Sequence, residues 1–172
     1  NIALKIRFPI AWIVKPTIYK QFVGGATLED CDPAVNPLKP RGAFAASDYS
    51  ADAKKTTAGI LATFEETKRS IMNAARNRNI AYAVFKPSTL TQDEVLCKAS
   101  EKREELTQEE KAEFAAFKER FMAHCQLAYD NDVRILVDAE DVCFQDAIDD
   151  LTDEALRKFN KDRAIVFATL QM

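Results

Sequence analysis

The sequence predicts an α/β protein of the (βα)8, TIM-like barrel class, with about five βα units present. Short apolar segments alternate with longer amphipathic ones along the 172 residues, which is typical of parallel strands joined by helices. Residues 135–137 and 165–168 are apolar throughout, as in strands buried on both faces. The alternation also permits a doubly wound sheet. The barrel is favoured because the phosphate-binding patterns GxGxxG and GxxxxGK followed by Ser or Thr are absent.

Five segments predict the strands. Each is a short apolar run that ends at glycine or at polar residues, and they cover 17–23, 42–47, 81–85, 133–137 and 164–170. A barrel of this class needs eight strands and roughly 250 residues, so five strands do not close it, and the last would leave an open apolar edge. We therefore expect residues 1–172 to be part of one catalytic barrel domain, with its C-terminal half absent and supplied by further chain or by a second chain.

The longer segments between the strands predict the helices. They cover 27–36, 57–78, a helix that opens at Thr91, a helix from Thr107 to about Tyr129, and 139–160 with a break near Leu151-Thr152. Apolar residues recur at helical spacing within 57–78. Thr91 and Thr107 are each followed three residues later by Glu, which is the capping-box pattern.

The composition excludes several classes of function. The net charge is −3, with 47% hydrophobic and 30% charged residues, and these values are typical of globular proteins. No basic block occurs, so nucleic-acid binding has no electrostatic footprint. No apolar run approaches the roughly 18 residues of a membrane span, and the N-terminus has no signal-peptide pattern. Peripheral contact with a membrane stays open, and the oligomeric state is not determined.

The cysteines do not predict a metal site. They are Cys31, Cys97, Cys125 and Cys143, and the single histidine is His124. No CxxC pair occurs, so the spacing supplies no close pair of metal ligands. Scattered thiols of this kind are typical of a reducing compartment, and we expect all four to be reduced.

Polar residues that follow the predicted strands form the candidate site. In a (βα)8 barrel, reactive residues gather at the carboxyl ends of the strands. The residues at these positions are Asp48, Lys86, Asp138, Glu140 and Gln171, with the Gly24-Gly25 turn on the same rim.

Each of these residues has more than one interpretation. Lys86 is either a surface lysine, a cation that faces a substrate carboxylate, or a Schiff-base amine. Asp138 is either a helix N-cap or a residue that holds a cationic substrate or orients a neighbour. Glu140 could stabilise the first turn of a helix through the helix dipole. A buried amide at Gln171 would suit the edge of a flavin ring.

Six segments in order resemble motifs of the proline dehydrogenase family. Residues 22–29 (FVGGATLE) resemble FxGGET, 48–50 are DYS, 85–90 (FKPSTL) resemble VKxTAL, 136–140 contain DAE, 144–149 (FQDAID) match FQxAID, and 159–171 resemble KYN followed by VFxTxQ. The match runs over nearly the whole chain and is closest to the compact, single-function members. The family has Glu where this chain has Ala26.

The resemblance implies an enzyme that binds FAD and oxidises L-proline to 1-pyrroline-5-carboxylate, in proline catabolism toward glutamate. Hydride would pass to flavin N5 and electrons on to a quinone. It implies a location in the mitochondrial matrix or at the inner membrane, or at the cytoplasmic face of a bacterial membrane.

The resemblance also assigns roles to five residues. Lys86 would contact the proline carboxylate, and Asp138 would lie beside substrate and flavin. Ala139 would pack near the flavin, while Thr169 and Gln171 would lie along it, Gln171 with a hydrogen bond. The family's arginines for flavin N5 and for the substrate carboxylate come later than Gln171, so we expect this chain alone to be inactive.

Two other functions fit the sequence. A Schiff-base barrel enzyme would use Lys86 as its amine. A truncated, non-catalytic paralogue that acts as a binding or regulatory piece would explain Ala26 and the lack of the later motifs.

Overall fold

The computed structural model describes residues 17, 19, 23–25, 27–49 and 55–171. They divide into two compact units, residues 1–44 and residues 45–172. All four strands of the described part, and its longer helices, belong to the second unit. In the described part of the chain, no helix is both long enough and apolar enough to cross a membrane.

The first unit contains short helical turns. They are the 3-10 turn η2 (Glu29–Cys31), the helix α4 (Asp32–Val35) and the 3-10 turn η3 (Lys39–Arg41). Gly25 lies so close to the first of these turns that an added Cβ would come within 2.6 Å of the carbonyl carbon of Asp30. A residue with a side chain would therefore push this turn out of place.

The first predicted strand, 17–23, lies largely outside the described residues. Within its described part, the Val23 N–H donates to the Tyr19 carbonyl at 2.8 Å. A hydrogen bond to the fourth residue back is a helical contact and not part of a strand ladder. The prediction of a strand over 17–23 is therefore wrong for the described residues of this segment.

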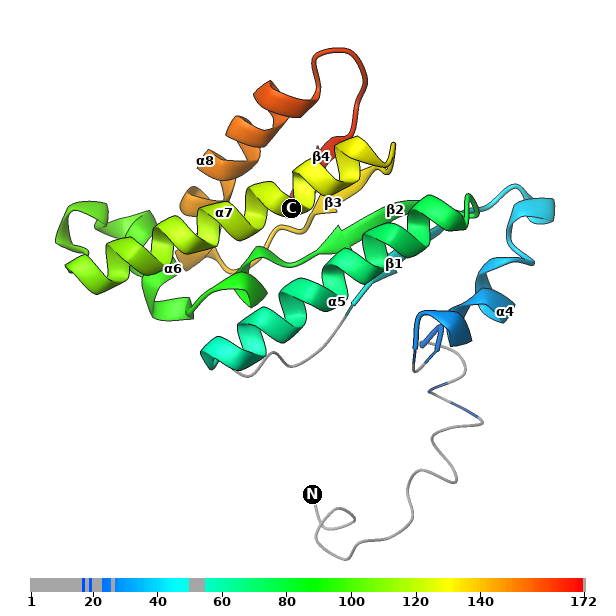
Figure 1. The fold of residues 1–172 in the computed structure, drawn as a ribbon, viewed down its shortest axis with the longest axis horizontal. Coiled ribbons are helices and arrows are strands. Elements are labelled where there is room, and N and C mark those ends of the chain that lie inside the picture. The colour runs from blue at the N-terminus through cyan, green and yellow to red at the C-terminus, as the bar shows by residue number, and fades with distance from the viewer. Residues whose placement is uncertain (1–16, 18, 20–22, 26, 50–54, 172) are drawn as a thin grey trace, which may run out of the picture. The chain divides into compact units, whose positions relative to one another are not determined.

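The second unit is built on one parallel sheet, in the order β1-β2-β3-β4 (Figure 1). The strands are β1 (Ala45–Asp48), β2 (Ile80–Phe85), β3 (Ile135–Val137) and β4 (Val166–Ala168). All three neighbouring pairs are parallel, which confirms the α/β class and four predicted strands. Because every strand runs the same way, their carboxyl ends meet at one edge.

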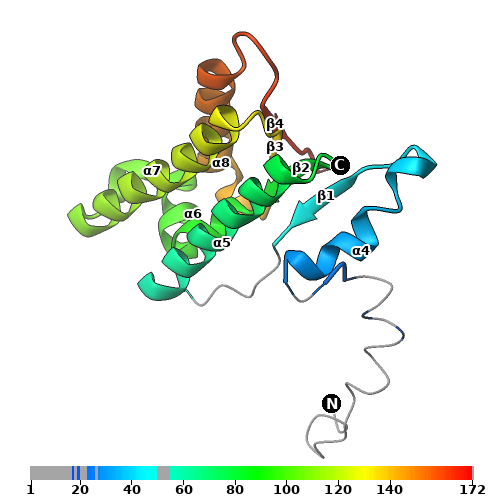
Figure 2. The same ribbon diagram turned by 45° about the vertical axis from the view of Figure 1, so that its right-hand side comes forward.

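Four longer helices are described in this unit: α5 (Thr57–Arg76), α6 (Asp93–Glu101), α7 (Gln108–Asp130) and α8 (Val142–Phe159). In both views they lie along one face of the sheet (Figures 1 and 2). α5 contacts β2 and α7, α7 contacts α8, and α6 contacts α8. Short 3-10 turns, η4 (Pro87–Leu90) and η5 (Arg103–Glu105), flank α6.

The predicted capping box starts α7. The Thr107 hydroxyl accepts from the Glu110 N–H at 3.3 Å, and the Glu110 carboxylate accepts from the Thr107 N–H at 2.7 Å. These bonds satisfy two backbone groups that a helix end leaves without partners. The sequence pattern is confirmed here.

At Thr91 the same pattern predicted a cap that does not form. α6 has Gln92 as its N-cap residue, without a side-chain capping bond. Thr91 is fully buried, and its hydroxyl donates to Glu113 of α7 at 2.9 Å. A contact between elements distant in sequence has therefore replaced the local cap.

Aromatic side chains fill the layer between sheet and helices. Phe117 and Phe121 of α7 are completely buried, and Phe121 meets Phe85 of β2 edge to face at 5.2 Å between ring centroids. His124 is also completely buried and stacks on Phe64 at 4.8 Å. Burial of each large side chain contributes about 2 kcal/mol, so this cluster fixes α7 against β2.

The two faces of the sheet differ because side chains alternate along each strand. Phe85 points toward α7, so its in-register partner Val137 lies on the helix-covered face. The opposite face carries Tyr82, Val84, Leu136 and Phe167. Tyr82 and Phe167 pack edge to face at 5.2 Å, and both remain partly exposed. This second face is apolar but incompletely covered by the described residues.

The expectation of four reduced cysteines is wrong for two of them. Cys97 of α6 and Cys143 of α8 form a disulfide, with Cα atoms 4.8 Å apart. Direct packing of α6 on α8 brings together two residues separated by 46 positions, and their spacing in sequence gave no sign of it. Cys31 and Cys125 are free.

Candidate functional site

The candidate site lies at the carboxyl edge of the sheet. Asp48 is the last residue of β1, Lys86 follows β2, Asp138 follows β3 and Thr169 follows β4. The registers Phe85 to Val137 and Val137 to Ala168 align the next residues, Lys86, Asp138 and Thr169, in one row. By alternation this row lies on the face opposite the helices.

Lys86 and Asp138 form an ion pair across this row. The ammonium nitrogen of Lys86 lies 3.8 Å from a carboxylate oxygen of Asp138, and the two side chains are 42% and 32% exposed. Lys86 therefore has a carboxylate partner within the site and still reaches solvent. Such a cation can bind a second anion that enters from the open side.

Asp48 adds a second carboxylate near Lys86. Partial burial raises the pKa of Asp48, and the Asp138 charge raises it further, while the Lys86 cation lowers it. The three charged groups therefore act on one another at the ends of β1, β2 and β3.

Asp138 is not a helix N-cap. The N-cap residue of α8 is Asp141, and the helix begins at Val142, three residues later than predicted. The backbone before the helix binds residues after β4: the Ala139 N–H donates to Thr169 Oγ1 at 2.6 Å. The Thr169 hydroxyl lies 3.1 Å from Asp138 Oδ1, to which it can donate. The helix also has no break near Leu151.

Gln171 lies on the same segment of the rim. Its Nε2 donates to the Ala139 carbonyl at 3.1 Å. Its side chain is exposed in the described structure, and its contact with a flavin edge stays a prediction. Thr169 and Gln171 thus hold both polar backbone groups of Ala139.

Glu140 does not stabilise the first turn of a helix but binds Ser88 through its side chain. It lies before α8, so it cannot act within the first turn of that helix. Its Oε1 accepts from the Ser88 N–H at 2.7 Å, and its Oε2 accepts from the Ser88 hydroxyl. Burial raises the pKa of Glu140, although the hydrogen bonds from Ser88 and the nearby cations of Lys55 and Lys86 lower it.

Sequence reasoning missed Ser88 and Lys55. Ser88 lies in η4, two residues after Lys86, and its carbonyl accepts from Lys55 Nζ at 2.7 Å. Lys55 also pairs with Asp93 at the start of α6. Ser88 stood within a motif segment, but no local pattern indicated its long-range partner Glu140.

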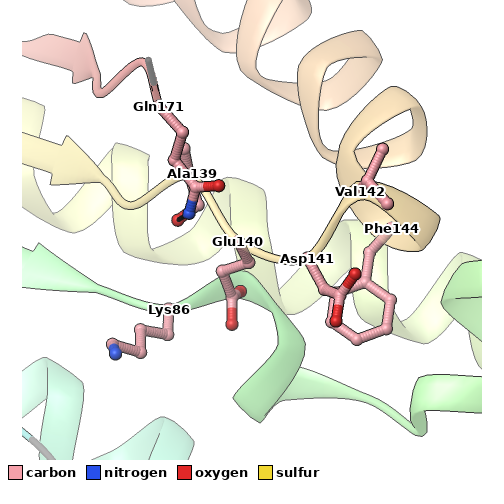
Figure 3. Close-up of a pocket in the computed structure, with 7 residues that line it drawn as sticks. All are labelled: Lys86, Ala139, Glu140, Asp141, Val142, Phe144 and Gln171. Carbon is pink, nitrogen blue, oxygen red and sulfur yellow. Dashed lines mark hydrogen bonds between the residues drawn. The ribbon is translucent and has the colours of Figure 1, made fainter.

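A pocket of about 480 Å³ opens beside these residues (Figure 3). Its lining consists of Lys86, Ala139, Glu140, Asp141, Val142, Phe144 and Gln171. The volume is in the range of small-molecule sites. Asp138 and Thr169 are not among the lining residues, but each contacts one of them: Asp138 pairs with Lys86, and Thr169 accepts from the Ala139 N–H.

The Gly24-Gly25 turn, which the sequence predicted to lie on the same rim, is not in the unit that carries the sheet. Gly24 and Gly25 belong to the first unit and are described within it alone. Among the described residues, no group of three or more His, Cys, Asp or Glu side chains is placed to hold a metal ion.

Comparison with known proteins identifies the family. Residues 31–172 match the family model described as proline dehydrogenase. The chain belongs to the proline dehydrogenase family. The match contains the four described strands and the polar residues that follow them, so the polar row at the sheet edge is part of the family domain.

Individual relatives cover different parts of the chain. A carbapenem antibiotics biosynthesis protein, CarD, of Pectobacterium carotovorum subsp. carotovorum is 29% identical over 87% of this chain. Proline dehydrogenase 1, mitochondrial, of Drosophila melanogaster is 61% identical over 26% of the chain. The Caenorhabditis elegans protein of the same name is 39% identical over 38% of it. The chain spans 40%, 6% and 11% of these relatives, in the same order.

Proposed function

We propose that this chain is part of the catalytic barrel of a FAD-dependent proline dehydrogenase, which oxidises L-proline to 1-pyrroline-5-carboxylate and passes electrons to a quinone. Membership of the family supports proline oxidation in general. The observation that carries the finer proposal is the row of Lys86, Asp138 and Thr169 at the carboxyl ends of neighbouring parallel strands, where barrels of this class place their catalytic groups.

The sheet supports the barrel in this proposal. Four parallel strands have helices along one face, and the other face carries partly exposed apolar side chains such as Leu136 and Phe167. In a closed (βα)8 barrel that second face would become the packed interior.

Lys86 and Asp138 suit the two ends of proline. The Lys86 ammonium would bind the substrate carboxylate by a charge-assisted hydrogen bond. Oxidation of the C–H bond next to the ring nitrogen develops positive charge toward the imine, and the Asp138 carboxylate would stabilise that charge. Together they would orient the ring so that one C–H bond faces the electron acceptor.

The residues along the rim fit a flavin ring. Ala139 would leave room for the ring, while Thr169 and Gln171 supply a hydroxyl and an amide at its edge. Leu170 and Val142 are exposed apolar side chains on the same segments, and apolar contact is what the faces of such a ring require. Bound FAD would supply a hydride acceptor.

The Schiff-base alternative is less well supported. A Schiff-base lysine must be free to attack a carbonyl carbon, whereas Lys86 is ion-paired with the Asp138 carboxylate at 3.8 Å. A non-catalytic paralogue remains the second candidate, because Ala26 stands where the family has Glu.

The names of the relatives bear on location. The Drosophila and Caenorhabditis proteins are named as mitochondrial. We propose a mitochondrial location, at the inner membrane or in the matrix, if the protein is eukaryotic.

Product analysis tests the proposed function. The purified full-length protein, supplied with FAD, L-proline and a soluble quinone, should form 1-pyrroline-5-carboxylate, detected by trapping its imine with an aromatic amino-aldehyde. Absence of product from L-proline, with flavin bound, would contradict the proposal.

A further inference from the structure

Glu140 joins two segments of the rim. Its carboxylate accepts both the N–H and the hydroxyl of Ser88, and its own N–H donates to Gln145 Oε1 at 2.9 Å. Figure 3 shows the Glu140 side chain directed toward the segment that follows Lys86, while the Lys86 side chain extends to the other side. Although Glu140 lines the pocket, both of its carboxylate oxygens already accept hydrogen bonds.

Ser88 belongs to a tightly held turn. The Thr89 N–H and hydroxyl donate to the Lys86 carbonyl at 3.0 and 2.6 Å, and these bonds close the turn that contains Ser88. The Ser88 carbonyl accepts a hydrogen bond from Lys55 Nζ at 2.7 Å. A shift of Ser88 would therefore shift the backbone of Lys86.

The segment before Glu140 is fixed from the opposite direction. The Thr169 hydroxyl bonds the Ala139 N–H, and Gln171 bonds the Ala139 carbonyl. The segment that contains Asp138 is thus hydrogen-bonded to the residues that follow β4. The Ser88–Glu140 pair connects the turn after Lys86 to this same segment. Together with the Lys86–Asp138 ion pair, this pair links the segments that carry the cation and the anion of the site.

The environment of Glu140 argues against a role in stability alone. Burial raises the pKa of Glu140 even though Ser88 donates two hydrogen bonds to it. A site that disfavours the charge of its own carboxylate costs stability near neutral pH. Groups of this kind are typical of functional sites.

We propose that Glu140 is a positioning residue that sets the place of Lys86 relative to Asp138, and so determines recognition of the carboxylate of a cyclic amino acid. This inference rests on the proposed function. It deepens that function because Glu140, through Lys86, would affect binding of the substrate carboxylate and not binding of the ring amine.

Flavin reduction in the full-length protein without oxygen tests the inference. L-proline is compared with pyrrolidine, the same ring without the carboxylate, and the half-saturating concentration of each is measured. Glu140→Ala should raise the value for L-proline about tenfold, the size of one weakened charge-assisted hydrogen bond, and leave the value for pyrrolidine within about twofold. Glu140→Gln keeps an acceptor for the Ser88 N–H and should restore most of the proline affinity.

A matched control separates positioning from stability. Glu110 also accepts one backbone N–H and one side-chain donor, at 2.7 Å each, but in the capping box of α7. Glu110→Ala should leave the ratio of the two half-saturating concentrations unchanged. If Glu140→Ala does not fold, Ser88→Ala removes one of the two bonds and should raise the value for L-proline alone by about threefold.

The outcomes distinguish the two proposals. A wild-type flavin that L-proline does not reduce overturns the proposed function and this inference with it. A wild-type flavin that L-proline reduces, with the same ratio in Glu140→Ala as in wild type, overturns the inference alone. An equal loss for proline and pyrrolidine in Glu140→Ala also overturns it, because the role would then be structural.

Discussion

At the scale of the residue, Lys86 provides the most direct test of the site. Lys86→Ala in the full-length enzyme should raise the apparent KM for L-proline about 10- to 100-fold, because a charged hydrogen bond to the substrate is lost. Flavin content should stay unchanged. Lys118→Ala is the matched control, since Lys118 also pairs with a carboxylate, Glu154, at 2.7 Å. Unaltered proline kinetics in Lys86→Ala would refute the role of Lys86.

His124 gives a second prediction at this scale, for stability against pH. Burial lowers the pKa of His124 from 6.5 to about 4, so the unfolded chain binds its proton more tightly than the folded one. Stability therefore falls as pH falls from 6.5 toward 4, by about 3 kcal/mol in total. In urea unfolding of the full-length protein, the stability difference between wild type and His124→Asn should shrink over this window.

The size of that effect can be assigned to one group. His124 is the single histidine of the sequence, so no other histidine of this chain titrates there, and the carboxylates are common to both proteins. The substitution also removes the contact of 3.1 Å between the imidazole Nε2 and the Phe64 carbonyl. A difference that stays constant from pH 7 to pH 4.5 would contradict the prediction.

The sequence allowed part of the site to be predicted. Lys86 and Asp138 each follow a continuous apolar run. The residues before them, Phe85 and Val137, are paired in neighbouring parallel strands, so Lys86 and Asp138 lie side by side. Ser88 and Lys55 could not be found in this way. Their partners lie 52 and 38 positions away, Glu140 for Ser88 and Asp93 for Lys55, and such contacts depend on how the loops fold.

At the scale of the element, the capping box of α7 carries a prediction. Thr107→Ala removes the acceptor for the Glu110 N–H and should lower the free energy of unfolding by about 1 kcal/mol. Gln108→Ala, in the same exposed turn, is the control and should change it by less than about 0.5 kcal/mol. Equal effects of the two substitutions in urea unfolding would show that the box does not stabilise the helix.

Helices and strands were predictable where local chemistry decides them. α7 and the four strands satisfy local pattern and tertiary packing at once. The start of α8 was missed because the backbone of Ala139 is bound by Thr169 and Gln171, so the chain turns helical only at Val142. Thr91 does not cap α6, because its hydroxyl donates a hydrogen bond to Glu113 of α7.

At the scale of the whole molecule, the described sheet accounts for the position of the site but not for the whole of an enzyme. The four parallel strands bring the polar row to one edge and leave an apolar face partly exposed. The chain spans less than half the length of the relatives it matches. The proposal therefore concerns the full-length protein, in which that face would be covered.

The most direct test of the central claim is the absorbance spectrum of the purified full-length protein, recorded without oxygen before and after addition of L-proline. We predict flavin bands that are lost when L-proline is added, which would establish a flavin cofactor and proline oxidation together. A protein that stays colourless with added FAD, or one whose flavin bands persist in excess L-proline, would contradict the account and favour a non-catalytic member of the family.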